Sequence, residues 1–516
     1  MADLRPFTNV DPATAAALRR NGCDPHEVDQ FVEHVLAYIY TLVPRPPFTH
    51  SGRLTALAAS TDGVDRISSL PDELLRNIVA RLPVKDAACT AVLSTCWRTL
   101  WRSTPLVLSD AHLLPDGHVW PPTRANSPAV TAAMSRILEA HPGPFHCVNL
   151  VCSHMNGYLA RLARWIQLLA AKGVQDLVLV NRPWPQDVPL PATLFSVSTL
   201  TSLYIGFWKL PSMDVLRGAS FPHLVELGIC SVEMEHGAVE SLVARSPVLE
   251  ILNIEGCRRE LRLRLVSQSL RCVQICSSVV ENITMVKAPC LERLILSDRV
   301  GRGAFRVRIV NAPKLHTFGF LEPGQVLEVG KTAIMLGIEA STSTMLTTVK
   351  ILSLNVRFGV RSDVEMVPTF LRCFPNVERL HIMSKRCDQP IGNHLTRKFW
   401  EESGPIENVV SRIHTMCLRE FRGDTSEVGF LEFFFGSARS LRSAFILMAN
   451  PLFTPYSTKE ADAKVRHSCR NMVSESSYQF VVVNQGQPGG APWNFKTGAD
   501  FSFPDPFSFA TGVFQA

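Results

Sequence analysis

The stretch that decides how this chain is organised is residues 69–101, SLPDELLRNIVARLPVKDAACTAVLSTCWRTLW. Ser69 is a typical helix-capping residue, and Pro71 fits a first helical turn, where its missing N–H costs nothing. The helix is expected to end before Pro83, because the residue that precedes a proline is pushed away from helical angles. Four apolar residues recur at intervals of four and mark one face of this helix: Leu70, Leu74, Ile78 and Leu82.

Two more short helices are expected in the same stretch. One runs from Ala87 to Leu93 with Asp86 as its cap, and the next carries Trp97 and Trp101 on one side. A unit of about forty residues is marginally stable and cannot hide this much apolar surface by itself. We therefore expect a partner helix to cover part of the apolar face. The alternative is that the three helices are an ordinary piece of a larger core.

The stretch resembles the F-box, with matching spacing from end to end. The matching residues are Leu70-Pro71-x-Glu73-Leu74, Ile78, Leu82-Pro83, Asp86-Ala87 and Val92-Leu93-Ser94-x-x-Trp97-Arg98-x-Leu100-Trp101. The resemblance implies docking on a Skp-type adaptor and, through it, on the cullin scaffold of an SCF-type ubiquitin ligase. Thr95 and Cys96 depart from the plant members of the family, which usually carry basic residues there. The residues expected at the adaptor interface are Leu70, Pro71, Leu74, Ile78, Leu82, Val92 and Trp97.

Composition describes a globular chain of 516 residues, about three domains long, with 46% hydrophobic and 19% charged residues. The net charge of +6 is mild and no dense basic run is present, so we expect no nucleic-acid partner. The 14 cysteines are scattered without a CxxC pair, which indicates no metal site and a reducing compartment, cytoplasmic and/or nuclear. The N-terminus lacks an apolar signal core, and the apolar stretch 31–43 is too short to span a bilayer, so no membrane partner is expected.

The chain before the F-box-like stretch (65–105) is expected to be an N-terminal extension, residues 1–60. It contains an amphipathic helix that starts at Asp24-Pro25 and repeats apolar residues every four positions from Phe31 to Val43. We expect this helix to pack against the F-box or the following domain. A proline-rich linker, residues 44–60, follows.

From about residue 145 to 400 one phrase recurs: Pro-x-apolar-x-x-apolar-x-apolar, as in Pro222-x-Leu224-x-x-Leu227-x-Ile229. The phrase also occurs without its proline, as at Leu200 and Leu270. The leucines that open six occurrences are about 21 to 25 residues apart, which is the period of leucine-rich repeats: Leu200, Leu224, Leu249, Leu270, Leu291 and Leu315. Stacked repeats bury apolar rows that no single repeat can bury, and their strands line a curved parallel sheet. The residues around Ile283 and Val307 are expected to form strands on the opposite wall. A parallel β-helix, or an α/β fold with coincidental spacing, is the alternative.

These repeats resemble plant-type leucine-rich repeats of F-box proteins, and residues 405–450 resemble the FBD segment that follows such repeats. The FBD matches are Cys417-Leu418-Arg419-Glu420-Phe421-x-Gly423, Glu427, Leu431, Phe434, Ala438 and Leu441. The strand spacing continues through this segment, so we expect final repeats and a cap. The tail, residues 455–516, is expected to be loosely ordered, with a basic helical piece near Lys459–Arg470 and an edge strand at Val481–Val483.

Candidate catalytic groups are few. Cys387, near His381 and His394, is the best candidate nucleophile, but no wider motif surrounds it, so we expect no enzyme, no cofactor and no catalytic residue. Four arginines lie close together, and alternation places Arg262 and Arg264 opposite the neighbouring leucines: Arg258, Arg259, Arg262 and Arg264. Such a face is either solvated or a docking patch for an acidic substrate or phosphate.

The sequence thus predicts an α/β protein: a three-helix F-box, a leucine-rich-repeat solenoid and an FBD-type cap. The resemblance implies a non-catalytic substrate-recognition subunit of an SCF-type cullin–RING ubiquitin ligase with an unknown protein substrate. A repeat-based scaffold or ligand sensor that acts outside a ligase is the alternative. Residues between the inward leucines are the expected substrate contacts: Glu226, Asn253, Gln274, Arg293, Ser353, Arg379 and His381.

Overall fold

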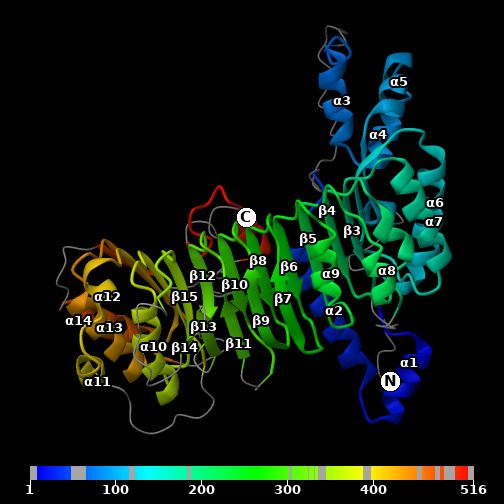
Figure 1. Cartoon of the computed structure of the whole chain (residues 1–516). Coiled ribbons are helices and arrows are strands. Elements are labelled where there is room, and N and C mark those ends of the chain that lie inside the picture. The colour runs from blue at the N-terminus through cyan, green and yellow to red at the C-terminus, as the bar shows by residue number, and fades with distance from the viewer. Residues whose placement is uncertain are drawn as a thin grey trace. The chain divides into compact units, whose positions relative to one another are not determined.

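The computed structural model describes most of the chain (Figure 1). The described ranges are 8–47, 66–114, 122–182, 188–301, 305–322, 325–329, 332–334, 345–386, 397–449, 456–470, 477–481 and 494–508. The chain divides into two compact units. The N-terminal unit is Met1–Leu249 with Ile254–Arg258, and the C-terminal unit is Glu250–Asn253 with Arg259–Ala516.

The F-box-like stretch forms three short helices in the N-terminal unit: α3 (Asp72–Ala80), α4 (Val84–Thr90) and α5 (Thr95–Ser103). Two expected caps are wrong. The Ser69 hydroxyl donates to the Arg66 carbonyl, and α3 begins directly after Pro71. Asp86 lies inside the first turn of α4, which starts early because Pro83 takes the extended cap position. Ser94 caps α5 by accepting the Trp97 N–H at 3.4 Å.

The three helices pack around their own small core. Leu75 and Val79 of α3 face Trp97 and Leu100 of α5, and all four are 4% exposed or less. A parallel bridge from Pro83 to Val107 ties this core to strand β1 (Leu106–Ser109). The F-box helices are therefore anchored to the first strand of the sheet that follows.

The sheet of the N-terminal unit is parallel throughout, in the order β1-β2-β3-β4-β5. Its other strands are β2 (Phe145–Leu150), β3 (Asp176–Val180), β4 (Ser202–Gly206) and β5 (Glu226–Cys230). Helices connect these parallel strands, as crossover geometry requires: η1 (Asp110–Leu113), η2 (Arg124–Asn126), α6 (Ser127–Ala140), α7 (Leu159–Ala171), η3 (Ala192–Ser196), α8 (Met213–Arg217) and α9 (Ala238–Ala244). Strand β6 (Ile251–Glu255) lies where the chain passes between the two units.

The N-terminal extension contains α1 (Pro12–Arg20) and α2 (Pro25–Leu42), and α2 is the amphipathic helix that the sequence predicts. It packs on the repeats rather than on the F-box helices. Arg182, which is 1% exposed and follows β3, donates to Asn9 Oδ1 at 2.9 Å and pairs with Glu33 at 2.5 Å. The Tyr40 hydroxyl of α2 donates to the Val151 carbonyl at 2.8 Å.

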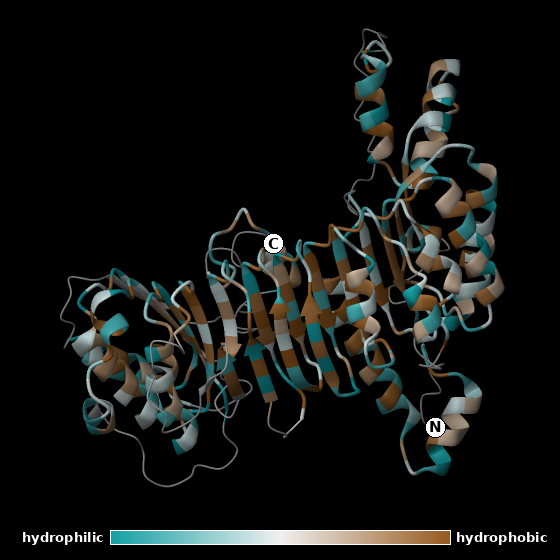
Figure 2. Cartoon of the chain, viewed as in Figure 1, coloured by the Kyte–Doolittle hydropathy of each residue, from teal (hydrophilic) through white to brown (hydrophobic). Residues whose placement is uncertain are grey.

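The C-terminal unit has a parallel sheet in the order β8-β10-β12-β15-β16-β17-β18-β19. These strands are β8 (Cys272–Cys276), β10 (Arg293–Ser297), β12 (Thr317–Leu321), β15 (Ile351–Val356), β16 (Arg379–Ser384), β17 (Thr415–Phe421), β18 (Ser443–Met448) and β19 (Ser477–Val481). The strands of both units appear mainly apolar in Figure 2. The six leucines that open the repeat phrases are each 0% exposed and lie two residues before a strand, which confirms the repeat period.

A sharp backbone turn recurs at the end of the repeat strands. Phe207, Ser231, Ser277 and Asp298 directly follow β4, β5, β8 and β10, and each has a φ between 46° and 58°. This left-handed conformation is unfavourable for residues with a β-carbon. Gly256, with a φ of 65°, takes the same position after β6 without that cost. The same left-handed conformation recurs at one place in five repeats, which shows that stacking of the repeats imposes it.

A second sheet forms the opposite wall of the C-terminal unit, in the order β14-β13-β11-β9-β7. Its strands are β7 (Leu261–Val266), β9 (Val280–Lys287), β11 (Phe305–Ile309), β13 (Gln325–Val329) and β14 (Thr332–Ile334), and only the β13–β14 pair is antiparallel. Ile283 and Val307 lie inward in β9 and β11 with 0% exposure, so the expected second-wall strands are confirmed.

The segment that resembles the FBD continues the repeat sheet through β17 and β18, with α13 (Thr425–Ser437) between them. The other helices of this unit are α10 (Arg361–Cys373), α11 (Arg397–Glu402), α12 (Glu407–Ser411), α14 (Thr458–Cys469) and α15 (Phe495–Ala499). The expectation of a loosely ordered tail is wrong for its described parts. Helix α14 and strand β19 form near the predicted places, and residues 494–508 lie on the sheet, because their aromatic side chains and carbonyls find partners there.

Candidate functional site

The described residues leave a group of apolar side chains uncovered on the F-box helices. Leu74, at 51% exposed, lies with Ile78 on the face of α3 that points away from Leu75 and Val79, and the exposed Leu70 lies in the turn just before the helix. In the turn after α4, Val92 is 85% exposed and Leu93 is also exposed. We call this set the exposed stripe: Leu70, Leu74, Ile78, Val92 and Leu93. Large apolar groups in water are unfavourable unless another surface covers them.

The other residues expected at the adaptor interface have different surroundings. Trp97 is only 4% exposed, and its indole N–H donates to Ser68 Oγ at 2.8 Å. Its ring therefore holds α3 against α5 from inside. Leu82 is half-buried, whereas Pro71 is exposed at the start of α3. Helical periodicity alone does not tell which side of so small a bundle is inside, so the sequence predicts Trp97 among the surface residues.

The expected substrate contacts lie on the repeat strands, but most are not open to solvent. Glu226 of β5 accepts the Tyr204 hydroxyl at 2.5 Å, and burial raises its pKa. In the C-terminal unit Asn253 accepts an amide hydrogen of Gln274 at 2.8 Å, and Ser353 is 0% exposed. Gln274, Arg293, Arg379 and His381 contact residues 494–508, which we call the C-terminal segment. Figure 1 shows this segment in red beside β8 and β10.

Arg293 holds the middle of the C-terminal segment. It is 1% exposed and donates to the carbonyls of Gly498 at 2.8 Å, Asp500 at 3.1 Å and Phe503 at 2.5 Å. These charge-assisted hydrogen bonds offset part of the cost of burying its charge, and burial still lowers the pKa of Arg293. Next to it, the Arg271 guanidinium lies 3.7 Å from the ring centroid of Phe501, within cation–π range.

Asp505 forms the charged centre of the contact. Its Oδ2 lies 3.1 Å from His381 Nε2 and 3.3 Å from Arg379, and both Asp505 and His381 are buried. Burial alone would lower the pKa of His381, but the Asp505 carboxylate outweighs it and raises the pKa to about 9. Burial alone would raise the pKa of Asp505, but His381, the Phe507 N–H and Arg379 lower it to about 2. The pair is therefore charged at neutral pH.

The end of the C-terminal segment lies over β12, β16 and β17. The Phe507 ring is 5.1 Å from the Phe320 ring and 5.5 Å from the His381 ring, and Arg419 donates to the Phe507 carbonyl at 3.0 Å. Beneath it, burial would raise the pKa of Cys417, but Arg419 and His381 lower it. Cys417 is 2% exposed, so this thiol has no access to a substrate in this arrangement.

The C-terminal segment is absent from the site that the sequence predicts. One signal was available: Phe495, Phe501, Phe503 and Phe507 are concentrated in a short stretch with Asp505, in a chain that is only 8% aromatic. A stretch without apolar periodicity carries no information about which strands it contacts. Only the structure brings it to strands more than 200 residues earlier in the chain.

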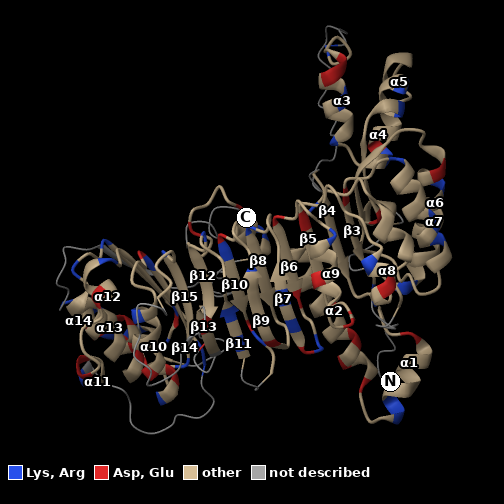
Figure 3. Ribbon diagram, viewed as in Figure 1, with Lys and Arg blue, Asp and Glu red and all other residues tan. Residues whose placement is uncertain are grey.

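The arginines of β7 belong to a solvated strand face. Arg262 and Arg264 alternate with buried leucines, as predicted, and Arg262 pairs with Glu281 of β9 at 2.6 Å. Blue bands of basic residues mark β7 and β11 in Figure 3. On β11, Arg306 and Arg308 pair with Glu328 of β13. These charges are thus matched across strands rather than gathered into an anion site.

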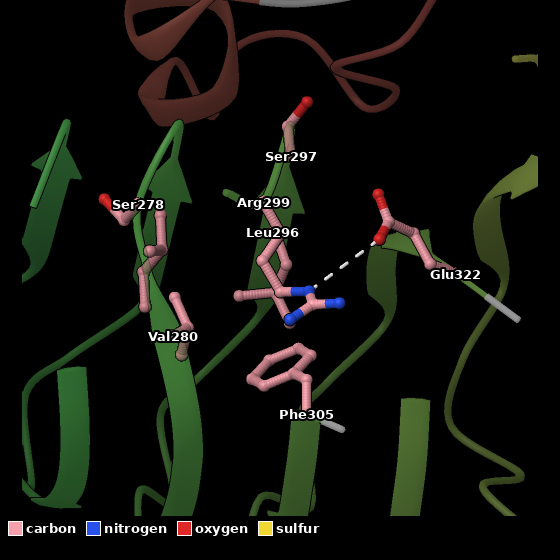
Figure 4. Close-up of a pocket in the computed structure, with 8 residues that line it drawn as sticks. Ser278, Val280, Leu296, Ser297, Arg299, Phe305 and Glu322 are labelled. Carbon is pink, nitrogen blue, oxygen red and sulfur yellow. Dashed lines mark ion pairs between the residues drawn. The ribbon is translucent and has the colours of Figure 1, made fainter. Parts of the chain in front are cut away.

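A small pocket lies between the two walls of the C-terminal unit (Figure 4). Arg299 crosses it, with its guanidinium 5.8 Å from the Phe305 ring centroid and 4.0 Å from the Glu322 carboxylate. The cavity volume is about 10 Å³, enough for about one water molecule. It is too small for an organic ligand.

Other candidate chemistry is limited. Cys387 and His394 lie outside the described residues, and His381, the third member of that candidate set, is paired with Asp505. Within the described ranges no group of three or more His, Cys, Asp or Glu residues is placed to hold a metal ion. A search of the same residues finds no helix with the length and apolarity needed to cross a membrane.

Three family models match the chain. They are the F-box domain over residues 67–108, the LRR repeats of the FBD-associated F-box protein At5g56370 over residues 162–382, and the FBD over residues 401–446. The matches fall on the F-box helices, the repeat strands and the α13 segment.

Several proteins of Arabidopsis thaliana are similar to this chain. An FBD-associated F-box protein is 27% identical over 351 residues, covering 61% of this chain and 79% of that protein. The F-box/LRR-repeat protein At3g26922 is 28% identical over 253 residues, covering 49% and 73%. The F-box/FBD/LRR-repeat protein At1g13570 is 28% identical over 196 residues, covering 37% and 44%. The chain therefore carries an F-box, leucine-rich repeats and an FBD segment in that order, the domain set of the plant F-box/FBD/LRR-repeat proteins.

Proposed function

We propose that the chain is the substrate-recognition subunit of an SCF-type cullin–RING ubiquitin ligase. The exposed stripe binds a Skp-type adaptor, the adaptor links the chain to the cullin, and the repeat unit binds a protein substrate. The chain contributes no catalytic group. It acts by raising the effective concentration of substrate lysines near a ubiquitin-loaded enzyme held elsewhere in the complex.

The observation that carries this proposal is the division of apolar residues in the F-box helices. Leu75, Val79, Trp97 and Leu100 satisfy the internal core, while the exposed stripe has no role in that core. Helix-in-groove recognition uses apolar residues spaced at i and i+4 on one helix face, as Leu74 and Ile78 are on α3. Trp97 then supports the interface from beneath, and Leu82 borders it.

The test is binding of the full chain to a purified Skp-type adaptor. Leu74 and Ile78 are 51% and 39% exposed, so adaptor binding could bury the equivalent of about nine tenths of one such side chain. Burying that much apolar area contributes roughly 1.5–3 kcal/mol to the binding free energy. A Leu74→Asp/Ile78→Asp variant should therefore bind at least about tenfold more weakly. Arg76→Ala is the matched control, because Arg76 is exposed on the opposite side of α3 and its loss changes the net charge by the same amount as one Leu→Asp substitution.

The result that overturns the interface is adaptor affinity within about threefold of wild type for the double aspartate variant. The assignment to a ligase has a separate test, since a chain that binds the adaptor outside a ligase would also pass the first one. Proximity labelling with the proteasome blocked should enrich proteins whose lifetime depends on the intact chain and on cullin neddylation. If no such protein's lifetime depends on neddylation, the scaffold alternative replaces the ligase proposal.

A further inference from the structure

The C-terminal segment is held largely through its main chain. Arg293 donates to the Gly498 and Phe503 carbonyls, Gln274 donates to the Phe495 carbonyl at 3.0 Å, and Arg419 to that of Phe507. Every peptide has carbonyl oxygens, so these donors recognise the course of a peptide main chain rather than its sequence. Another peptide that followed the same path would meet the same donors.

Selectivity comes from three side-chain contacts. Phe501 lies against Arg271, Phe507 packs on Phe320 and His381, and Asp505 pairs with His381 and Arg379. The sheet leaves room for the last ring: a β-carbon at Gly319 would lie 2.5 Å from Phe507 Cζ. Together these contacts select aromatic side chains on either side of one carboxylate.

The repeat fold does not require this polar surface. The inward row alone, such as Leu294 and Leu296 in β10, buries the apolar area that holds the strands in the stack. Arg293 occupies the outward position beside them and takes no part in that inward row. A buried guanidinium is costly without good partners. The three carbonyls that accept its hydrogen bonds all belong to the C-terminal segment, which indicates that this face is shaped for a bound peptide.

We propose that the outward face of the sheet from β8 to β17 is a peptide-binding site for extended acidic–aromatic segments, and that residues 494–508 occupy it as an internal ligand. A protein partner that carries phenylalanines flanking an aspartate displaces the C-terminal segment and takes its place. That this partner is the ubiquitination substrate rests on the function proposed above, whereas the binding itself requires no adaptor.

A tethered segment has an effective concentration in the millimolar range, so a free peptide competes poorly until the internal one is weakened. The probe is a fluorescent peptide of residues 494–508, NFKTGADFSFPDPFS. Its affinity is measured for the full wild-type chain and for a full-length Asp505→Asn/Phe507→Ala variant, which loses the central ion pair and the aromatic anchor of the internal segment. The peptide should bind this variant at least tenfold more tightly than the wild-type chain.

Two controls identify the site. Adding Gly319→Ala to the variant fills the space under the Phe507 ring without changing charge, and should weaken peptide binding at least tenfold. Asp462→Asn, which removes an aspartate from α14, should leave the wild-type affinity unchanged. Hydrogen exchange of the unaltered chain gives a second readout: a millimolar isotope-labelled peptide should accelerate exchange of residues 494–508.

The proposal is overturned if the peptide binds the wild-type chain and the double variant equally. It is also overturned if a scrambled peptide binds the variant as tightly as the native order, or if saturating peptide leaves exchange of the C-terminal segment unchanged. None of these measurements contains an adaptor. Failure here therefore leaves the ligase proposal standing, and failure of the adaptor test leaves the peptide site standing.

Discussion

Glu427 offers the sharpest test of how the FBD segment is held together. It is 0% exposed at the third position of α13, and its Oε2 accepts three backbone N–H groups at the start of the helix. These come from Arg422 at 3.0 Å, Gly423 at 2.8 Å and Asp424 at 2.9 Å. Its Oε1 accepts the Ser384 hydroxyl of β16 at 2.5 Å. One carboxylate thus joins the helix start to the neighbouring strand.

Replacing Glu427 by alanine should loosen this segment strongly. The Gly423 N–H and the Ser384 hydroxyl make buried hydrogen bonds to Glu427, and each costs roughly 1–3 kcal/mol when it loses its acceptor. The part-buried Arg422 and Asp424 N–H groups add less, so the total cost should be about 3 kcal/mol. Glu427→Gln should cost much less, about 1 kcal/mol, because its carbonyl oxygen can still accept the N–H groups and its amide can donate to Ser384. Burial raises the pKa of Glu427 to about 7, so a neutral side chain is tolerated at this position.

The assay is hydrogen exchange of the amides in α13 and β17 of the full chain, since a chain with two compact units need not unfold in one step. A loss of about 3 kcal/mol corresponds to exchange that is faster by about a hundredfold. Glu407→Ala is the control, because Glu407 is a first-turn glutamate of α12 that is exposed. Exchange in the alanine variant that rises less than about fivefold would refute the reasoning, since it would mean a cost under about 1 kcal/mol.

Two further predictions follow from the buried contacts. Docking of the C-terminal segment should depend on pH. Because the pKa of His381 is raised, its contribution to the stability of docking is complete below about pH 6.5 and is lost as pH rises toward about 9. Because the pKa of Asp505 is lowered, its contribution is complete above about pH 4 and is lost as pH falls toward about 2. Exchange protection of residues 494–508, corrected for intrinsic rates, should thus be greatest between about pH 4 and 6.5, and Asp505→Asn should flatten the profile. Trp97→Ala should cost roughly 3–5 kcal/mol and expose α3 and α5 to proteolysis, because it removes a core ring and its bond to Ser68. Equal protease resistance of this variant and the wild-type chain would show that Trp97 does not hold these helices.

Much of the repeat region could be predicted because each repeat depends on local spacing. An apolar residue two positions before a strand, then two more at alternate positions, is enough to define which side faces the core. Leu270, Val273 and Ile275 follow this pattern and are all buried. The second-wall strands near Ile283 and Val307 were predictable for the same reason.

The F-box helices show where this reasoning stops. Leu74 and Leu75 are neighbours of the same type, yet one is 51% and the other 1% exposed. Trp97 was expected on the outer surface and lies inside. In a bundle of three short helices, apolar residues cover more than one face, and packing between helices decides which face is buried.

The order of the parts and the inward rows of the repeats can be predicted from the chain alone, because period and spacing are local properties of a sequence. What covers the outward rows depends on the folded arrangement of the whole unit. Residues such as Arg293 satisfy the repeat equally well whether they meet water or a partner, so no local pattern distinguishes the two. The partner, Gly498 and its neighbours, lies some 200 residues later in the chain. A contact across that separation depends on how the whole stack is assembled.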